Sequence, residues 1–307
     1  MIELSVGIVT PSFNQGSFLE KTIDSVLSQN YTRLQYVIID GGSTDGSVEI
    51  IRKYEKYLEY WISETDRGQS EAINKGLRRL RTEIWAYLNS DDTYEPGTLH
   101  KIVTAFQNSN VRWVTGRGLY VDEKGNPVKE MIPVSDWSLD DVIASLIVDP
   151  VMASVQVSTF MRRSVIERFG YFDEDLHYCM DCEYGLRLLL RGIRPYVVDE
   201  VLAKATLHSE SKTVLQDSAG EFTREKVEIL KRLLRSDLNT PLFQTVLNTL
   251  RQYQRAQALD SVRSAWLTNG RLAGLNAWVG LAVMDPLLAG RRQALGLLRR
   301  ILQGSIA

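Results

Sequence analysis

Two adjacent carboxylates, Asp91 and Asp92, follow an apolar run that ends at Leu88. Such a run predicts a buried strand, and open α/β sheets bind ligands beyond the carboxyl ends of their strands. Neighbouring carboxylates repel each other unless a cation or a proton relieves the charge. Oxygen-rich ligation without sulfur suits Mg²⁺ or Mn²⁺, which often complete their coordination with substrate phosphates and water. Because Asn, Ser and Asp also favour turns, the segment 89–92 taken alone is equally compatible with a surface turn.

Three further polar clusters follow predicted strands in the first hundred residues: Thr10-Pro11-Ser12, Asp40-Gly41-Gly42-Ser43 and Asp66-Arg67-Gly68. If the strands are parallel, their carboxyl ends share one edge of the sheet, so all four clusters should converge there. The paired glycines would let a ligand approach the backbone closely. The sequence contains neither Gly-x-Gly-x-x-Gly nor a P-loop, so a dinucleotide fold gains no support and a P-loop NTPase is excluded.

The elements that would position these clusters alternate between strands and helices. Apolar runs predict four strands, over Leu4–Thr10, Leu34–Asp40, Tyr60–Ile62 and Ile84–Leu88, with amphipathic helices between them. This rhythm is typical of a parallel, doubly wound sheet. After about residue 108 shorter strands are expected, which should join the sheet edge as antiparallel pieces; one of them is predicted over Ser154–Phe160.

The second half of the chain carries two more candidate groups. A helix is predicted over Cys179–Arg191, which places Asp181 in its first turn, and a strand over Tyr196–Leu207 ends at His208. A carboxylate in a first turn is often there only because the helix dipole favours it, and a single histidine is often structural. From about Glu221 onward the pattern is helical, so we expect an α/β domain over residues 1–220 and a helical appendage over 221–307.

Composition narrows the classes of function. The chain has 307 residues, a formal net charge of −2 and two cysteines, which argues against a nucleic-acid binder and against a disulfide-stapled secreted fold. No signal peptide pattern opens the chain, and the longest apolar stretch, Ala277–Met284, is too short to span a bilayer. The Cys179-x-x-Cys182 spacing lacks a thioredoxin-like context. We therefore expect a cytoplasmic protein whose membrane contact is at most peripheral, on the inner face.

The C-terminal segment is strongly basic. Between Ser261 and Ala307 there are six arginines and a single acid, Asp285, while leucines recur at helical spacing. This pattern is consistent with a helix that lies on an anionic membrane surface. Arg291 falls within the apolar arc, which favours the alternative of a helix packed on its own domain with a solvated basic face.

Several segments together resemble family 2 inverting glycosyltransferases, which have the nucleotide-sugar-binding fold called GT-A. In the first half these segments are Gly7–Gln15, Val37–Gly46, Ser63–Gln69 and Leu88–Asp92. In the second half they are Phe160–Arg163, Gly170–Glu174 and Met180-Asp181, followed by Arg187. The resemblance runs in order over roughly residues 4–215 and does not cover the helical tail. It implies a mainly parallel, mixed GT-A sheet.

Carried over position by position, the resemblance implies a role for each candidate residue. The nucleotide-sugar would be bound by Thr10, Pro11, Asp40, Ser43, Asp66, Arg67, Asn89 and Ser90. Mn²⁺ or Mg²⁺ would be held by Asp91, Asp92 and His208, Asp181 would be the catalytic base, and Gln156 would lie on the acceptor side. Asn89 departs from the family's Asp-x-Asp pattern. Because its amide is neutral, less negative charge should surround the metal. For Gln156, a buried amide bonded to backbone is an equally good interpretation.

The expected activity is therefore transfer of a sugar from a nucleoside-diphosphate sugar to a hydroxyl. A metal would stabilise the leaving diphosphate, and a carboxylate would take the proton of the incoming hydroxyl. The resemblance suggests a saccharide or lipid-linked acceptor in polysaccharide assembly. Two alternatives are a sugar-phosphate nucleotidyltransferase, whose basic triphosphate loop is missing from residues 10–16, and a non-catalytic sugar-nucleotide-binding protein, which would be expected to have lost Asp91, Asp181 or His208.

Overall fold

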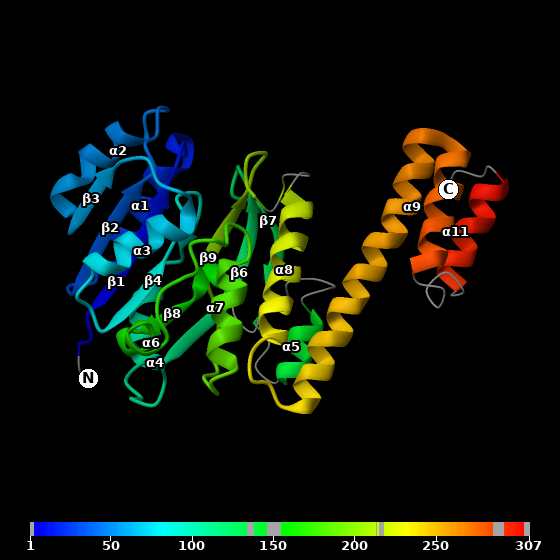
Figure 1. Ribbon diagram of the computed structural model, residues 1–307. Helices are drawn as coiled ribbons and strands as arrows, with labels where there is room; N and C mark the ends of the chain where they lie inside the picture. The colour runs from blue at the N-terminus through cyan, green and yellow to red at the C-terminus, as the bar shows by residue number, and fades with distance from the viewer. Residues whose placement is uncertain are drawn as a thin grey trace. The chain divides into compact units, whose positions relative to one another are not determined.

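The computed structural model describes residues 3–133, 138–145, 155–212, 214, 218–284 and 292–303. The chain divides into two compact units. The first ends at Lys226, and the main part of the second begins at Val227. The first unit contains the β-sheet and the helices around it, and the second is helical (Figure 1). The expected domain boundary near residue 220 stays a prediction.

Four parallel strands form the first half of the sheet, as their apolar runs predict. They are β1 (Val6–Ser12), β2 (Leu34–Asp40), β3 (Tyr60–Ser63) and β4 (Ile84–Tyr87). Their order is β3-β2-β1-β4, with β1 in the middle of the parallel group. Because β1, β2 and β4 are almost entirely buried, continuous apolar runs suit them better than alternating ones.

The second half of the sheet is mixed. β8 (Phe160–Arg162) lies antiparallel between β4 and β6 (Trp113–Asp122), and β6 pairs in parallel with β9 (Tyr196–Leu207). Two short strands complete it: β7 (Pro127–Met131) forms a hairpin with β6, and β5 (Thr93–Tyr94) pairs with the far side of β9. A mixed, mainly parallel doubly wound sheet was the predicted class, and this class is confirmed.

The strand expected over Ser154–Phe160 is wrong in its position. Residue 154 lies outside the described residues, Gln156–Ser158 forms a 3₁₀ turn, η2, and the strand begins at Phe160. The hydroxyls of Ser158 and Thr159 both donate to the Val155 carbonyl, three and four residues earlier in the chain. Such side-chain bonds to nearby backbone compete with a strand ladder, which alternating polarity alone does not reveal.

Helices cover both faces of the sheet (Figure 1). The helices of the first unit are α1 (Gly16–Leu27), α2 (Ser47–Tyr54) with the 3₁₀ turn η1 (Glu55–Tyr57), α3 (Gln69–Arg79), α4 (Thr98–Ala105), α5 (Leu139–Ser145), α6 (Arg163–Phe169), α7 (Met180–Leu189) and the start of α8 (Ser218–Leu234). Side chains of α1, α2 and α4 join the core cluster on one face, together with Ile8 and Ile84. On the other face α3 approaches β1 so closely that a Cβ on Gly76 would lie 2.4 Å from Val9 Cγ1.

The second unit has a small core of its own. α9 (Thr240–Met284) is interrupted at Gly270, whose φ of 83° is left-handed, and α11 (Arg292–Gln303) packs against it. The buried cluster between these helices contains Val262, Trp266, Leu281, Leu297 and Ile301. Within the ranges that the structure describes, every helix is too short or too polar to cross a membrane.

Candidate functional site

The predicted polar clusters do meet at one edge of the sheet. Ser12 at the end of β1 is in register with Asp40 at the end of β2, and Asp40 is in register with Ser63 of β3. One residue past β4, the Leu88 amide donates to the Val9 carbonyl of β1. The segment 89–92 therefore begins beside the end of β1. The register of parallel strands therefore brings four loops together, as their sequence positions predict.

Asp40 organises the loop that follows β2. Its side chain is fully buried, and Oδ2 accepts hydrogen bonds from the amides of Gly42 (3.1 Å) and Ser43 (2.9 Å) and from the Ser63 hydroxyl (2.6 Å). Oδ1 accepts from the Ser43 hydroxyl at 2.6 Å. Both oxygens thus have protein partners, and the carboxylate fixes the turn in which Gly42 adopts a φ of 86°.

Asp66 lies across from this turn. Its Oδ1 accepts from the Gly68 amide at 2.9 Å, while its Oδ2 would lie 3.1 Å from a Cβ on Gly41. Burial raises the pKa of Asp66 above the usual value of a carboxyl. A side chain at Gly41 would fill the space in front of this carboxyl, so the glycine keeps it open.

Two other expected donor-binding residues have protein partners. The buried hydroxyl of Thr10 bonds to that of Tyr36 at 3.0 Å, and Pro11 is buried within β1. Arg67 has an exposed side chain that pairs with Glu71 at 2.9 Å and with Glu174. Its hydrogen bond lowers the pKa of Glu71 to about 2. Arg67 therefore joins the loop after β3 to the segment that precedes α7.

Asp91 and His208, separated by 117 residues, form a direct pair. Asp91 Oδ2 and His208 Nε2 lie 3.0 Å apart, and the imidazole is buried and stacked on Phe18 with ring centroids 4.5 Å apart. α1 fixes the turn that carries Asp91, since the buried Thr22 hydroxyl donates to the carbonyls of Ser90 (2.9 Å) and Asp92 (2.7 Å).

Asp92 has a different environment from Asp91. Its carboxylate is buried, and its oxygens accept from the Thr206 amide at 3.2 Å and from the Asn89 amide group at 3.1 Å. Burial and the charge of Asp91 hold the pKa of Asp92 well above its usual range. In the described part of the chain no three His, Cys, Asp or Glu side chains are grouped so as to hold a metal. Of the three expected metal ligands, Asp91 and His208 are thus adjacent, whereas Asp92 accepts hydrogen bonds from Thr206 and Asn89.

Asn89 is the centre of a network of side-chain amides that the sequence does not predict. Its Oδ1 accepts from Gln69 Nε2 at 2.6 Å, and its Nδ2 also lies 3.4 Å from Gln156 Oε1. Lys212 Nζ donates to Gln69 Oε1 at 3.0 Å. The residue that departs from the Asp-x-Asp pattern therefore links the loops after β3 and β4 to η2.

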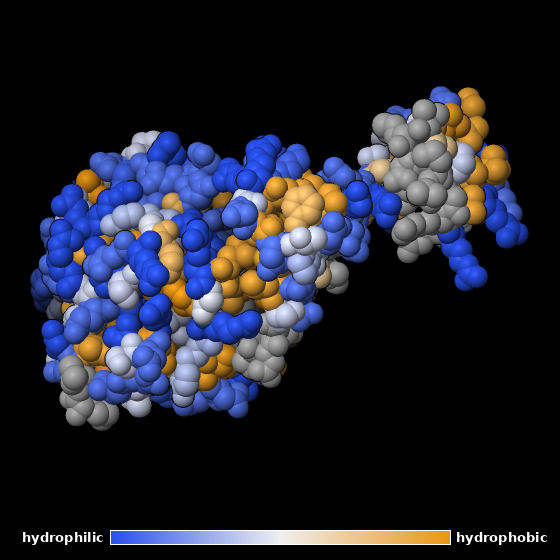
Figure 2. Space-filling model, turned by 60° about the horizontal axis from the view of Figure 1, so that its bottom comes forward, coloured by the Kyte–Doolittle hydropathy of each residue, from blue (hydrophilic) through white to orange (hydrophobic). Residues whose placement is uncertain are grey.

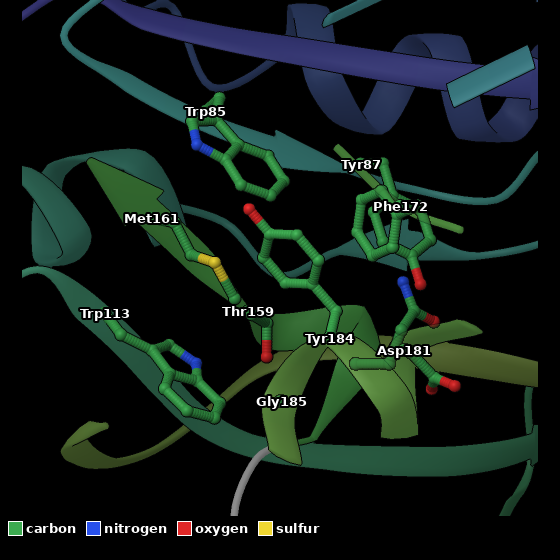
Figure 3. Close-up of a pocket in the computed structure, with 10 residues that line it drawn as sticks. Trp85, Tyr87, Trp113, Thr159, Met161, Phe172, Asp181, Tyr184 and Gly185 are labelled. Carbon is green, nitrogen blue, oxygen red and sulfur yellow. The ribbon is translucent and has the colours of Figure 1, made fainter. Parts of the chain in front are cut away.

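Asp181 lies in the first turn of α7, where its Oδ1 accepts from the Cys182 amide at 2.8 Å. Burial raises the pKa of this carboxyl above its usual value. Figure 3 shows Asp181 and Tyr87 at one end of a pocket and Trp113 at the other. The remaining lining residues are Trp85, Gln156, Thr159, Met161, Phe172, Tyr184 and Gly185.

The aromatic side chains of this pocket were missed by motif analysis. Trp85 and Tyr87 alternate with Ala86 along β4, a period of two that places both on the α7 side of the sheet. Trp113 Nε1 is a buried donor of the pocket that has no hydrogen-bond partner in the described structure, whereas the Gln156 side chain bonds to that of Tyr87. The pocket thus offers a free N–H group and a carboxylate.

The sequence matches a known protein family over the part of the chain that contains most of this site. The sequence model of glycosyl transferase family 2 matches residues 7–170, which is more than half of the chain. The chain belongs to glycosyl transferase family 2. The match includes the Asp40, Asp66 and Asn89–Asp92 loops and Gln156, and it ends before Asp181 and His208.

Curated relatives are similar over the same part of the chain. An uncharacterized glycosyltransferase of Rickettsia typhi is 27% identical over 213 residues, which are 68% of this chain and 65% of that protein. The chain therefore spans less than two thirds of the length of this relative. The putative teichuronic acid biosynthesis glycosyltransferase TuaG of Bacillus subtilis is 27% identical over 212 residues, 67% of this chain and 80% of TuaG.

Solved structures share the fold of this family 2 member. TarS of S. aureus, residues 1–349 in complex with UDP-GlcNAc, aligns with a TM-score of 0.62 and 17% identity, covering 98% of this chain and 91% of TarS 1–349. The mannosyltransferase PcManGT of Pyrobaculum calidifontis, in complex with GDP-Man and Mn²⁺, aligns with a TM-score of 0.60 and 17% identity over 99% of this chain and 89% of its own. At this identity the likeness concerns the fold, and it agrees with the predicted GT-A class.

Proposed function

We propose that this protein is an inverting, metal-dependent glycosyltransferase that moves a sugar from a nucleoside-diphosphate sugar to a hydroxyl acceptor. The observation that carries the proposal is the pairing of Asp91 with His208 at the sheet edge that also holds Asp181 beside a pocket. Family membership supports glycosyl transfer and weighs against a nucleotidyltransferase. The complexes of TarS with UDP-GlcNAc and of PcManGT with GDP-Man support a nucleotide-sugar donor.

On the donor side we infer different roles for the expected residues. Asp40 would act through the loop it holds, because both its oxygens already accept hydrogen bonds, and Ser43 would present its part of that loop. Thr10 and Pro11 would contact the nucleotide through the backbone, since the Thr10 hydroxyl is bonded to Tyr36. The Asp66 Oδ2 atom faces the glycine loop and would accept a hydrogen bond from the base. Arg67, Asn89 and Ser90 would line the remainder of the donor.

Asp91 and His208 are suited to hold Mn²⁺ or Mg²⁺. Asp91 offers the carboxylate oxygen that these ions prefer. His208 adds an imidazole nitrogen 3.0 Å away, and its stacking on Phe18 fixes the ring. When bound, the ion would neutralise charge on the diphosphate as it leaves. Asp92, whose raised pKa favours its neutral form, would support the turn without binding the ion directly.

Asp181 would be the general base. A single displacement at the anomeric carbon requires the acceptor hydroxyl to attack from the face opposite the diphosphate, where a carboxylate takes its proton. Burial raises the pKa of Asp181, which makes it a better proton acceptor than an exposed carboxylate once it is ionised. The Gln156 side chain, which lines the same pocket as Asp181, would contact the acceptor.

We further propose a saccharide or lipid-linked acceptor in surface polysaccharide assembly. Support comes from the similarity to a B. subtilis protein named for teichuronic acid biosynthesis. A lipid-linked acceptor would require the enzyme to work at the cytoplasmic face of a membrane, and the second unit has side chains suited to such a surface. Figure 2 shows hydrophobic residues beside strongly hydrophilic ones on this unit, at the right of the picture.

The test of the function is a donor screen on the full-length chain, read by thermal shift and then by transfer. We expect one nucleoside diphosphate and its sugar to raise the melting temperature in the presence of Mn²⁺, and EDTA to remove this effect. NMR of the product should show an inverted anomeric configuration. A retained configuration, or full transfer in excess EDTA, would contradict the proposed mechanism; stabilisation by the donor without any transfer would favour a non-catalytic binding protein.

A further inference from the structure

A buried carboxylate from α8 supports the start of the helix that carries Asp181. Glu225 Oε1 accepts from the His177 amide at 2.7 Å, and Oε2 accepts from the amides of Tyr178 and Cys179 at 2.8 Å each. The side chain of Cys179, the N-cap residue of α7, makes no capping bond. Glu225, 46 residues downstream of Cys179, therefore fixes the three residues that lead into α7, while the first-turn amide of Cys182 is bonded by Asp181.

The burial of Glu225 needs this arrangement. The residue is 4% exposed, and an ionised carboxylate in that position is unfavourable unless hydrogen bonds and charges compensate it. Three amide donors, of His177, Tyr178 and the N-cap residue Cys179, supply that compensation at the positive end of the α7 dipole. Lys212 adds a positive charge that acts on both Glu225 and Asp181, and its Nζ donates to the His177 carbonyl at 2.7 Å.

The same segment is also fixed from the donor side. The Ser70 hydroxyl, at the start of α3, donates to the Leu176 carbonyl at 2.5 Å. A Cβ on Gly68 would lie 2.9 Å from His177 Nδ1, so the loop after β3 packs directly on this segment. Residues 176–179 are thus held between the donor-side loop and α8, immediately before the turn that contains Asp181.

We propose that Glu225 is a positioning residue for sugar transfer, because it holds the start of α7 and places its negative charge at the helix end next to Asp181. This inference rests on the proposed role of Asp181 as the base. The negative charge offsets the positive end of the helix dipole, which would otherwise favour the ionised form of Asp181 and weaken it as a proton acceptor. The titratable groups that already act on Asp181 are Tyr87 from β4, Cys182 from α7 and Lys212.

The experiment compares Glu225→Gln with Glu228→Gln in the full-length chain. Glu228 lies on the same helix but pairs with Arg232 at the surface, so it is a matched control. The activity of a base rises with pH as the base loses its proton. Loss of the Glu225 charge should lower the pKa of Asp181 and move the acidic limb of kcat/KM to lower pH. We also expect kcat to fall about tenfold, less than the roughly hundredfold or larger fall expected for loss of the base itself, with the donor KM nearly unchanged, and no change for Glu228→Gln.

A second variant, Lys212→Met, should shift the pKa of Asp181 in the opposite direction. Removal of a positive charge should raise the pKa of Asp181 and move the acidic limb to higher pH. The shift in this variant gives the size expected when one charge near Asp181 is removed, and Glu225→Asn is measured in place of Glu225→Gln if the latter does not fold. An unmoved limb in the folded Glu225 variant, with Asp181→Asn inactive, would overturn the role of Glu225 and leave the proposed function standing. Wild-type turnover by Asp181→Asn would instead contradict the proposed function itself.

Discussion

The carboxylates of the site differ mainly in their partners. Asp40 accepts four hydrogen bonds and shapes a loop, Asp91 is paired with an imidazole, and Asp92 is bonded to Thr206 and Asn89. Asp181 accepts from the amide of the next residue and faces a pocket. Chemically identical side chains are thus suited to separate roles, because each is held by different donors.

Replacement of Asp181 by Asn tests the most important of these roles. The amide keeps the shape of the side chain but cannot take a proton, so turnover should fall roughly a hundredfold or more, the usual scale for loss of a general base. Donor affinity should stay nearly unchanged. Burial raises the pKa of Asp181, so the wild-type activity should begin to fall, on acidification, above the pH of about 4 expected for an exposed carboxyl.

The control for this measurement is Asp175→Asn, an exposed carboxylate of the preceding segment, which should have wild-type kinetics. Steady-state rates over a pH series, together with donor titrations, provide the necessary readings. An acidic limb that persists unchanged in residual Asp181→Asn activity would assign proton transfer to another group.

At the scale of elements, the sequence predicts more of the fold than of the site. Buried strands such as β1 and β4 are visible as apolar runs, and the order of polar clusters predicts their common edge. The strand over 154–160 fails because the hydroxyls of Ser158 and Thr159 both bond to the nearby Val155 carbonyl. Glu225 and Gln69 could not be predicted as supports, since their partners lie far away in the sequence and no spacing rule connects them.

The contact between α3 and β1 gives a prediction at this scale. In Gly76→Ala the new Cβ would lie 2.4 Å from Val9 Cγ1 and 2.9 Å from Cγ2, and both atoms belong to a stiff β-branched side chain in the core. Overpacking should destabilise the protein by about 1–3 kcal/mol, which exceeds the gain of up to about 1 kcal/mol from helix propensity. Gly220→Ala, in α8 with open space around it, is the control. Denaturant unfolding that shows Gly76→Ala as stable as the wild type would contradict this packing.

For the whole molecule, charge is unevenly divided along the chain. After Asp260 the sequence contains one acid, Asp285, and six arginines, although the full chain has a net charge of −2. Asp285 and Arg291 lie outside the described residues, but the structure exposes Arg292, Arg299 and Arg300 on α11. Leu295 and Leu302 on the same helix are 47% and 53% exposed, while Leu297 and Ile301 face the core. The sequence left two alternatives, a helix packed on its own domain and a helix on a membrane surface. In the structure α11 packs on the second unit with one side, and its other side is exposed, apolar and basic.

Such a surface should bind anionic membranes. Leucines can enter the headgroup region while arginines contact anionic lipids, and α9 adds the exposed side chains of Leu267, Leu272 and Val279. We expect the full-length protein to sediment with vesicles that contain phosphatidylglycerol at low salt and to be released at about 0.5 M salt, where screening shortens electrostatic interactions. Replacement of Arg299 and Arg300 by Gln, on the exposed side of α11, should weaken sedimentation several-fold, whereas the same change at Arg78 and Arg79 in α3 should leave it unchanged. Equal binding to neutral vesicles, or binding that survives high salt in the α11 variant, would show that these arginines do not direct the protein to a membrane.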